Sequence, residues 1–355
     1  MHRCSRVFLF LAASVTLLQA PGAFAAEPTS KTNDRLRQAI EQFPEADADG
    51  DGVLTLTEAK AYLAKRKTRQ SAETNRPKQP DPVRLEKSGN GLWVASTGHS
   101  LVAPALGPFE AAARLAGFDG HLQVRQISGG ATGAPRAHWE KPEEQQFVKR
   151  ALATGKCDVL TMGSHYEGSE VEDFARWIDL AIEHNPDIVI FVQDAWPYLT
   201  ELLDVKAGKT ADTDATFAKY QAKTAEINQW IGETVDRLNE KYPGKVHVIP
   251  IGNAMLELVR RQLAGELPGV DAIYVPGKKD ENPNEGPVGL YRDAIHPTPP
   301  VAILEGYLYY ACLYKKKPTE LSKGLYKDPE LDRILREVAW KTVTEHPRSG
   351  AKGEE

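Results

Sequence analysis

The chain has 355 residues, of which 41% are hydrophobic, so it is long enough to form one sizeable core and a small additional unit. It carries 44 Lys and Arg against 49 Asp and Glu, a formal net charge of −5. An acidic balance of this kind argues against a nucleic-acid partner, because binding to phosphates requires a basic surface.

The N-terminal residues have the features of an export signal. Arg3 and Arg6 precede an apolar run, Val7 to Leu18, and Ala23-Phe24-Ala25 supplies the small residues of a cleavage site. We predict a signal peptide over residues 1–25 and an exported protein, periplasmic or extracellular, with no membrane span after cleavage. The alternative is an uncleaved anchor, but the run is shorter than the roughly 20 residues that cross a bilayer. Cleavage lowers Lys and Arg from 44 to 42 against 49 acids, a net charge of −7.

A helix-loop-helix of the EF-hand type is predicted over residues 30–66. Apolar residues recur at helical spacing in Asn33 to Phe43 and in Leu56 to Lys65. The twelve residues from Asp47 to Glu58 between them match the spacing of a calcium-binding loop, in which Gly52 permits the sharp turn.

We therefore predict a structural Ca²⁺ in this loop, and no cofactor for catalysis. The expected ligands are the side chains of Asp47, Asp49 and Asp51, the carbonyl of Val53, Thr55 through a water, and two oxygens of Glu58. The alternative is a solvated acidic turn. EF-hands generally work in pairs, and no second loop is visible in the sequence.

The composition then changes twice along the chain. Residues 67–89 are rich in Lys, Arg, Gln and Pro, and they contain too few apolar side chains to offset the entropy of ordering, which predicts a linker. In residues 90–345, short apolar runs alternate with helical stretches, as in βα units around a parallel sheet. The predicted strands are Gly91–Thr97, Leu122–Ile127, Asp158–Met162, Asp187–Val192 and Val246–Ile251. The predicted helices between and after them are Phe109–Leu115, Gln145–Ala153, Val171–Ile182, Phe217–Leu238 and Val301–Leu313.

Two cysteines, Cys157 and Cys312, remain after the predicted cleavage. Each lies in an apolar run, where a free cysteine packs as a small hydrophobic residue, so we expect two buried thiols. A disulfide is the alternative in an exported chain.

Residues able to perform acyl transfer stand near the two ends of the α/β region. Ser100 follows the first strand in Thr97-Gly98-His99-Ser100-Leu101, where ligands of open α/β sheets bind. Asp293 and His296 lie three residues apart before the last predicted helix. A serine hydroxyl becomes a good nucleophile only when an imidazole takes its proton and a carboxylate orients that imidazole.

The two segments resemble a known family. The Gly-x-Ser-Leu around Ser100 and the Asp-x-x-His-Pro from Asp293 are similar to the first and last sequence blocks of the SGNH, or GDSL-like, hydrolases, over roughly residues 91–320. The resemblance implies a flavodoxin-like, three-layer α/β/α sandwich with a parallel five-stranded sheet. It also implies that Ser100 is the nucleophile, His296 the general base and acid, and Asp293 its orienting carboxylate.

The family's middle blocks supply oxyanion donors, and here the match is partial. After the second strand, Ser128-Gly129-Gly130-Ala131 offers the backbone amide of Gly130, with Gly129 as the alternative. The third block, Gly-x-Asn-Asp in the family, reads Gly163-Ser164-His165-Tyr166, so its asparagine donor is absent. An N–H of His165 or the hydroxyl of Ser164 could replace it; alternatively, His165 has a surface or helix-capping role. His99 stands where the family has aspartate.

The leading hypothesis is an esterase or acetylesterase that cleaves an acylated small molecule or carbohydrate through an acyl-serine intermediate. One alternative is a binding or scaffold module without catalysis, and another is a metal hydrolase built on His99, His165 and His296. The long loop from Gly265 to Arg292 is expected to border the substrate entrance. Trp139 and Trp196 could stack on a sugar or pack in the core.

Overall fold

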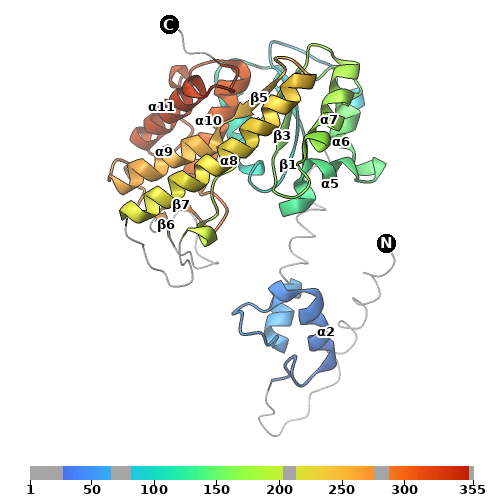
Figure 1. The fold of residues 1–355 in the computed structure, drawn as a ribbon, viewed down its shortest axis with the longest axis vertical. Coiled ribbons are helices and arrows are strands. Elements are labelled where there is room, and N and C mark those ends of the chain that lie inside the picture. Colours follow the sequence, from blue (N-terminus) through green and yellow to red (C-terminus); the bar gives the residue numbers. More distant parts are fainter. Residues whose placement is uncertain (1–26, 65–80, 203–212, 276–287, 352–355) are drawn as a thin grey trace. The chain divides into compact units, whose positions relative to one another are not determined.

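The computed structural model describes residues 27–64, 81–202, 213–275 and 288–351. The chain divides into two compact units, Met1–Gln79 and Pro80–Glu355 (Figure 1). The predicted signal peptide, residues 67–80 of the predicted linker, residues 65–66 at the end of the predicted EF-hand, and residues 276–287 of the predicted entrance loop lie outside the described residues. Each unit is described by itself below.

The first unit is a small helix-loop-helix around a core of four buried residues. Helix α2 (Asp34–Gln42) begins at the cap Asn33, whose side chain accepts hydrogen bonds from two backbone N–H groups of the first turn. A 3-10 turn, Pro44–Ala46, leads into the loop, and residues 56–64 form the second helix. The buried core residues, one or more from each segment, are Leu36, Ala46, Leu54 and Ala59.

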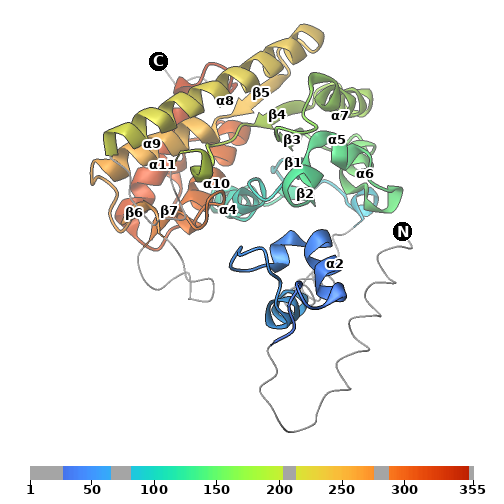
Figure 2. The ribbon, with the colours of Figure 1, turned by 60° about the horizontal axis from the view of Figure 1, so that its bottom comes forward.

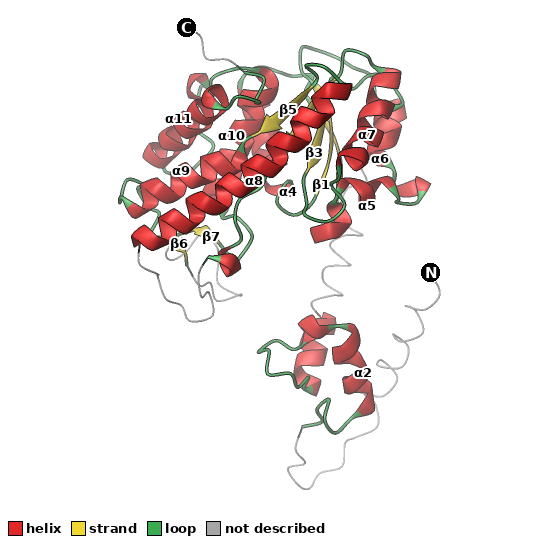
Figure 3. Cartoon of the chain, viewed as in Figure 1, coloured by secondary structure: helices red, strands yellow, loops and turns green. Residues whose placement is uncertain are grey.

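The second unit contains a five-stranded sheet in the order β2-β1-β3-β4-β5, in which all neighbouring strands are parallel. The strands are β1 (Trp93–Gly98), β2 (Leu122–Ile127), β3 (Val159–Gly163), β4 (Val189–Gln193) and β5 (Val246–Ile249). A second, two-stranded parallel sheet consists of β6 (Ala272–Tyr274) and β7 (Gly289–Tyr291). Figure 3 distinguishes the strands from the helices around them.

Alternate residues of the strands face two separate cores, which is why helices cover both faces of the sheet (Figures 1 and 2). Val94 belongs to one core and its neighbour Ala95 to the other. The Val94 core is completed by helices α4 (Ala103–Leu115), α9 (Ile251–Leu263), α10 (Pro299–Tyr314) and α11 (Pro329–Glu345). The Ala95 core is completed by α6 (Phe147–Leu152), α7 (Val171–His184) and α8 (Thr213–Lys241), and α5 (Pro135–Trp139) packs beside it. The predicted three-layer α/β/α sandwich is confirmed.

Several predicted boundaries are displaced along the chain, and two of them have a clear physical cause. Strand β5 ends at Ile249 and not at Ile251, because Pro250 caps helix α9, which the sequence reading did not predict. Helix α4 begins at Ala103, six residues before the predicted start, although it contains Pro108. Pro108 lies against the neighbouring helix α10, where a Cβ added to Gly306 would come within 2.4 Å of the Pro108 Cβ. Close packing of two helices at this point therefore overrides the poor helical propensity of proline.

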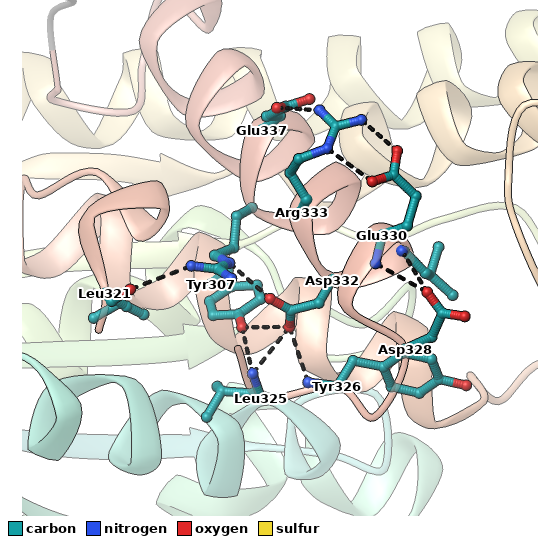
Figure 4. Close-up of polar contacts among 11 residues, drawn as sticks. Tyr307, Leu321, Leu325, Tyr326, Asp328, Glu330, Asp332, Arg333 and Glu337 are labelled. Carbon is teal, nitrogen blue, oxygen red and sulfur yellow. Dashed lines mark hydrogen bonds and ion pairs between the residues drawn. The ribbon is translucent and has the colours of Figure 1, made fainter. Parts of the chain in front are cut away.

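A buried carboxylate fixes the segment that leads into α11. Asp332 is 1% exposed, and its Oδ1 accepts hydrogen bonds from the Tyr307 hydroxyl and from the backbone N–H groups of Leu325 and Tyr326 (Figure 4). Its Oδ2 accepts a 2.7 Å hydrogen bond from Arg336. A buried charge with this number of partners is a structural anchor.

A second buried carboxylate, Asp194, is less completely paired. It follows β4, and its Oδ1 accepts a 2.9 Å hydrogen bond from the N–H of Gly252 in the first turn of α9. Among the described residues, its Oδ2 and the Oδ1 of Asn228 have no hydrogen-bond partner, and both residues line a cavity of about 10 Å³. Burial raises the pKa of Asp194 to about 8, an effect that the N–H groups of Gly252 and Ile251 only partly oppose.

This raised pKa makes stability depend on pH. Between about pH 4 and pH 8 the folded chain holds a proton on Asp194 that the unfolded chain releases, so stability falls as the pH rises through this range. Asp194→Asn should remove this contribution, because the amide does not titrate. In urea unfolding, wild type should lose about 2 to 4 kcal/mol more stability than the variant between pH 5 and pH 8. If the free energy of unfolding changed with pH equally in wild type and in the variant, the pH dependence could not be assigned to Asp194.

Two further expectations concern cysteines and membrane spans. Cys157 and Cys312 are both free and buried, as predicted, and burial raises the pKa of the Cys157 thiol to about 12. Within the described ranges, no helix combines the length and apolarity needed to cross a membrane.

Candidate active site

Ser100 stands on the tight turn between β1 and α4. The carbonyl of His99 accepts hydrogen bonds from the N–H groups of Val102 and Ala103, so the helix starts directly after the nucleophile candidate. A Cβ on Gly98 would lie 2.5 Å from a Val102 methyl carbon, so only glycine allows the strand to turn this sharply. The turn leaves Ser100 partly exposed at the carboxyl edge of the sheet.

The structure joins Ser100, His296 and Asp293 by hydrogen bonds. The Oγ of Ser100 lies 2.9 Å from Nε2 of His296. The other ring nitrogen, Nδ1, lies 2.9 Å from Oδ2 and 3.0 Å from Oδ1 of Asp293. These distances fall within the range needed for proton transfer. With a carboxylate at Nδ1, the neutral imidazole carries its proton there and presents a lone pair on Nε2 to the serine hydroxyl.

Asp293 is held in its charged form by the loop that contains it. Partial burial acts to raise its pKa, but hydrogen bonds from the backbone N–H groups of His296 and Ile295 and from the His296 side chain outweigh burial, so the pKa is lowered. The two backbone bonds measure 2.7 and 2.9 Å. Asp293 therefore stays in the carboxylate form, which can accept a hydrogen bond from the His296 imidazole.

The Asp293–His296 loop is attached to the segment after β4. The N–H of Leu199 donates to the Ala294 carbonyl at 2.8 Å, and the indole N–H of Trp196 donates to the Ile295 carbonyl at 2.9 Å. Trp196 is 1% exposed, so it is a core residue that supports the loop and not a platform for a sugar. The other candidate, Trp139, packs edge-on against Trp177 and lies under the Lys149 ammonium, which is 3.8 Å from its ring.

The segment after β2, residues 128–133, lies beside the turn that carries Ser100, here called the nucleophile turn. The N–H of Ser128 donates to the Gly98 carbonyl at 3.1 Å, and a Cβ on Gly133 would come within 2.6 Å of the same carbonyl oxygen. Gly130 begins a 3-10 turn with φ of +50°, a conformation that glycine adopts readily. Within the described residues, the backbone N–H groups of Gly129, Gly130 and Ser100 make no hydrogen bond to other groups. These three N–H groups are therefore not engaged by other described groups of the protein.

The structure distinguishes the two proposed replacements for the missing asparagine. The hydroxyl of Ser164 is buried and donates to the Gln193 carbonyl at 2.9 Å, so it is already in use. Nδ1 of His165 accepts a hydrogen bond from the N–H of Glu167 at 3.1 Å, which leaves Nε2 to carry the proton in the neutral ring. His165 is half-buried, and its ring meets that of His99 edge-on, with centroids 5.6 Å apart.

The sequence reading overlooked an exposed aromatic residue in this loop. Tyr166 follows His165 and is 49% exposed. Its ring stacks on Trp230 of α8 and meets Tyr198, which follows β4, edge-on. The sequence places Tyr166 directly after the segment Gly163-Ser164-His165, but a single tyrosine does not indicate whether its side chain is exposed.

The arrangement leaves no metal site at the three histidines. Both ring nitrogens of His99 and both of His296 face hydrogen-bond partners within the protein. In the part of the chain that the structure describes, the one cluster with metal-ligand spacing is formed by Asp47, Asp49 and Glu58. The metal-hydrolase alternative therefore has no geometric support.

The predicted calcium loop brings acidic oxygens together in the first unit. One carboxylate oxygen from each of Asp47, Asp49 and Glu58 lies within 4.8 Å of the others. The Asp51 carboxylate is not one of the clustered groups and accepts a hydrogen bond from the N–H of Val53, whereas the Thr55 hydroxyl donates to the clustered Glu58 at 2.7 Å. The three clustered residues are hard oxygen donors of the kind that Ca²⁺ takes.

An N-terminal strap, residues 27–30, runs antiparallel along this loop. The N–H of Ser30 donates to the Leu54 carbonyl at 2.8 Å, and the Ser30 hydroxyl accepts from the N–H of Leu54 at 3.0 Å. The N–H of Leu56 donates to the Pro28 carbonyl, and Thr29 forms a β-bridge with Thr55. The strap thus pairs with the backbone of the loop, although the sequence contains no second calcium-binding loop that could do so.

Comparison with known proteins adds only remote similarities of fold. A DUF4886 family protein from Bacteroides uniformis is 13% identical, with a TM-score of 0.49 over 72% of this chain and 96% of the other. A lipopolysaccharide acetyltransferase periplasmic domain from Salmonella ser. Paratyphi A is also 13% identical, with a TM-score of 0.37 over 64% and 85%. No family model matches the chain, and no curated protein does. The geometry around Ser100, and not these neighbours, therefore carries the functional argument.

Proposed function

We propose that the chain is an exported serine esterase that hydrolyses acyl esters, such as the acetyl esters of small molecules or carbohydrates. The observation that carries this proposal is the continuous hydrogen-bonded line from Ser100 Oγ through His296 to Asp293. Two of its members are 196 residues apart in the sequence. The fold does not require these three side chains to meet at the carboxyl edge of the sheet, so their contact supports a chemical role.

The geometry supports a two-step acyl transfer. Nε2 of His296 takes the Ser100 proton as Oγ attacks the ester carbonyl, and the protonated imidazole then gives that proton to the departing alcohol. In the second step, water attacks the acyl-serine and loses a proton to Nε2, and the protonated imidazole then gives this proton to the departing Ser100 Oγ, which releases the carboxylic acid and regenerates the serine hydroxyl. Asp293 stabilises the imidazolium formed in each step.

The developing oxyanion would be held by N–H groups at the same edge. The available backbone N–H groups of Ser100 and Gly130, with Gly129 as the alternative, are the proposed donors. We propose His165 as the third donor, through Nε2–H, in the place of the missing asparagine. Removal of one such donor typically lowers kcat by about 10² to 10³.

An active-site fluorophosphonate probe tests this function directly. Residues 26–355 should be labelled at Ser100, as located by peptide mass spectrometry, and should hydrolyse a short-chain aryl ester. The exposed Ser88 serves as a matched control, since Ser88→Ala should leave labelling and turnover unchanged. An unlabelled and inactive protein would support a binding module instead.

We also propose that the first unit binds one structural Ca²⁺ through Asp47, Asp49 and Glu58, with Asp51, the Val53 carbonyl and Thr55 completing the shell. Glu58 Oε1 accepts one hydrogen bond, from the N–H of Ala48, and keeps a lone pair for a metal. Glu58 Oε2 accepts two, from the N–H and the hydroxyl of Thr55, so the Thr55 hydroxyl would turn away when Glu58 binds a metal through both oxygens. When bound, the ion would neutralise the clustered carboxylates and stabilise the loop.

Calcium titration provides a second test, independent of esterase activity. Calorimetry on residues 26–355 should show uptake of one Ca²⁺, and Glu58→Gln should weaken binding by about 100-fold, because the loop loses its bidentate ligand. Glu41→Gln, the same change at an exposed residue of α2, should bind as wild type does. Equal affinities of wild type and Glu58→Gln would refute the site.

A further inference from the structure

His99, which replaces the aspartate of the family pattern, is buried and has both ring nitrogens engaged. Nε2 lies 2.6 Å from the carbonyl oxygen of Ser164, and Nδ1 lies 3.3 Å from the N–H of Leu101. A carbonyl can only accept and an amide N–H can only donate. The neutral ring with its proton on Nε2 is thus the only form that satisfies both partners.

These two bonds connect the nucleophile turn to the loop after β3. Leu101 follows Ser100 directly, and Ser164 precedes His165, the proposed third oxyanion donor. Gln193 forms a second connection. Its side-chain amide donates to the Leu101 carbonyl at 3.0 Å, and its backbone carbonyl accepts from the Ser164 hydroxyl at 2.9 Å. Gln193 is fixed in turn by the Tyr309 hydroxyl, 2.5 Å from its Oε1.

The packing around His99 leaves its ring little freedom. A Cβ on Gly133 would lie 2.6 Å from the His99 Cβ, and a Cβ on Gly163 would lie 3.5 Å from Nε2. The titratable groups that face the ring are His165 after β3, His296 before α10 and His138 of α5. Burial foremost, and the charges that His165 and His296 can carry, lower the pKa of His99.

We propose that His99 is a positioning residue, whose neutral ring locks the Ser100 turn to the Ser164–His165 loop and so sets the distance between nucleophile and oxyanion donor. This role rests on the proposed esterase function. Protonation of His99 would direct an N–H at the N–H of Leu101 and break the lock. Activity at acid pH therefore requires two neutral imidazoles, His296 for the proton transfer and His99 for the geometry.

Two amide substitutions separate the two bonds of the ring. In His99→Gln, the amide N–H has a reach similar to that of Nε2 and can donate to the Ser164 carbonyl. In His99→Asn, the Oδ1 replaces Nδ1 and can accept from Leu101, but the side chain ends short of Ser164. His121→Asn is the matched control, since His121 is a half-buried, hydrogen-bonded histidine that precedes β2, at the opposite edge of the sheet.

The experiment measures kcat, KM and the acid limb of log(kcat/KM) against pH for an aryl ester. We expect His99→Asn to lower kcat by about 10² with KM within threefold, because a misplacement of about 1 Å has an effect of this size. His99→Gln should stay within about fivefold of wild type, and its acid limb should have a slope of one, whereas that of wild type should approach two. His121→Asn should match wild type in kcat and in slope.

The outcomes separate this role from the function itself. An active wild type whose His99→Asn variant retains its kcat overturns the positioning role alone. If His99→Asn does not fold, the slope of His99→Gln decides, and a slope equal to that of wild type overturns the role. A wild-type chain that neither hydrolyses the ester nor reacts with the fluorophosphonate overturns the proposed function and the role together.

Discussion

Ser100→Ala should lower kcat for a short-chain aryl ester by about 10⁴-fold, while KM changes little. The hydroxyl is the only group of the site placed to form the acyl intermediate, and its removal leaves His296 with nothing to deprotonate except water. Residual turnover should come from the N–H groups that hold the oxyanion. Pre-steady-state kinetics with excess substrate should show a burst of released alcohol in wild type and none in the variant.

Stability measurements keep this result interpretable. Ser100 is partly exposed and its Oγ has His296 as its hydrogen-bond partner, so the variant should unfold at nearly the same temperature as wild type. Ser88→Ala again provides the control. Unchanged turnover in Ser100→Ala would reject Ser100 as the nucleophile.

Asp293→Asn should have the second largest effect, a fall in kcat of about 10² to 10⁴. An asparagine has one acceptor oxygen where the carboxylate has two, and its NH₂ group would face the backbone N–H groups or the Nδ1–H of His296. The imidazole then loses its preferred tautomer and its charge partner. Asp293 is 51% exposed, so water can replace part of the lost interaction, which favours the lower end of the range.

A matched control for this variant exists elsewhere in the same unit. Asp328 accepts hydrogen bonds from the N–H groups of Glu330 and Leu331, in the same local pattern that Asp293 forms with Ile295 and His296 (Figure 4). No histidine follows it at that spacing. Asp328→Asn should keep the helix cap, because asparagine caps a helix about as well as aspartate, and should leave kcat unchanged. A kcat for Asp293→Asn within threefold of wild type would exclude the orienting role.

Periodicity in the sequence predicted the sandwich because local patterns determine most of it. The strand over Leu122–Ile127 was predicted with its observed bounds, since Leu122 and Val124 alternate with polar residues, as is typical of a strand. The start of α4 was missed because prolines at 104 and 108 normally end or begin a helix. Packing against Gly306 of α10 is a contact between distant segments, which no local pattern reveals.

The candidate site was predictable to a similar extent. Residue type and order indicated Ser100, Asp293 and His296, and the structure places these side chains in hydrogen-bond contact; their catalytic roles stay predictions. The partner of His99, the Ser164 carbonyl, could not be found in this way, since it is a backbone atom 65 residues away. Backbone acceptors leave no trace in the identity of a residue, so the fold alone reveals such contacts.

The N-terminal strap has a consequence for how the protein matures. If export removes residues 1–25, the strap begins within two residues of the new amino terminus, and the protease that releases the chain also decides whether the acidic loop keeps its neighbouring strand. Trimming by five more residues would remove every backbone hydrogen bond from the strap to Leu54 and Leu56. If the acidic loop binds Ca²⁺ as proposed, the position of one peptide-bond cleavage would govern its affinity in a part of the molecule that contains none of the proposed catalytic residues.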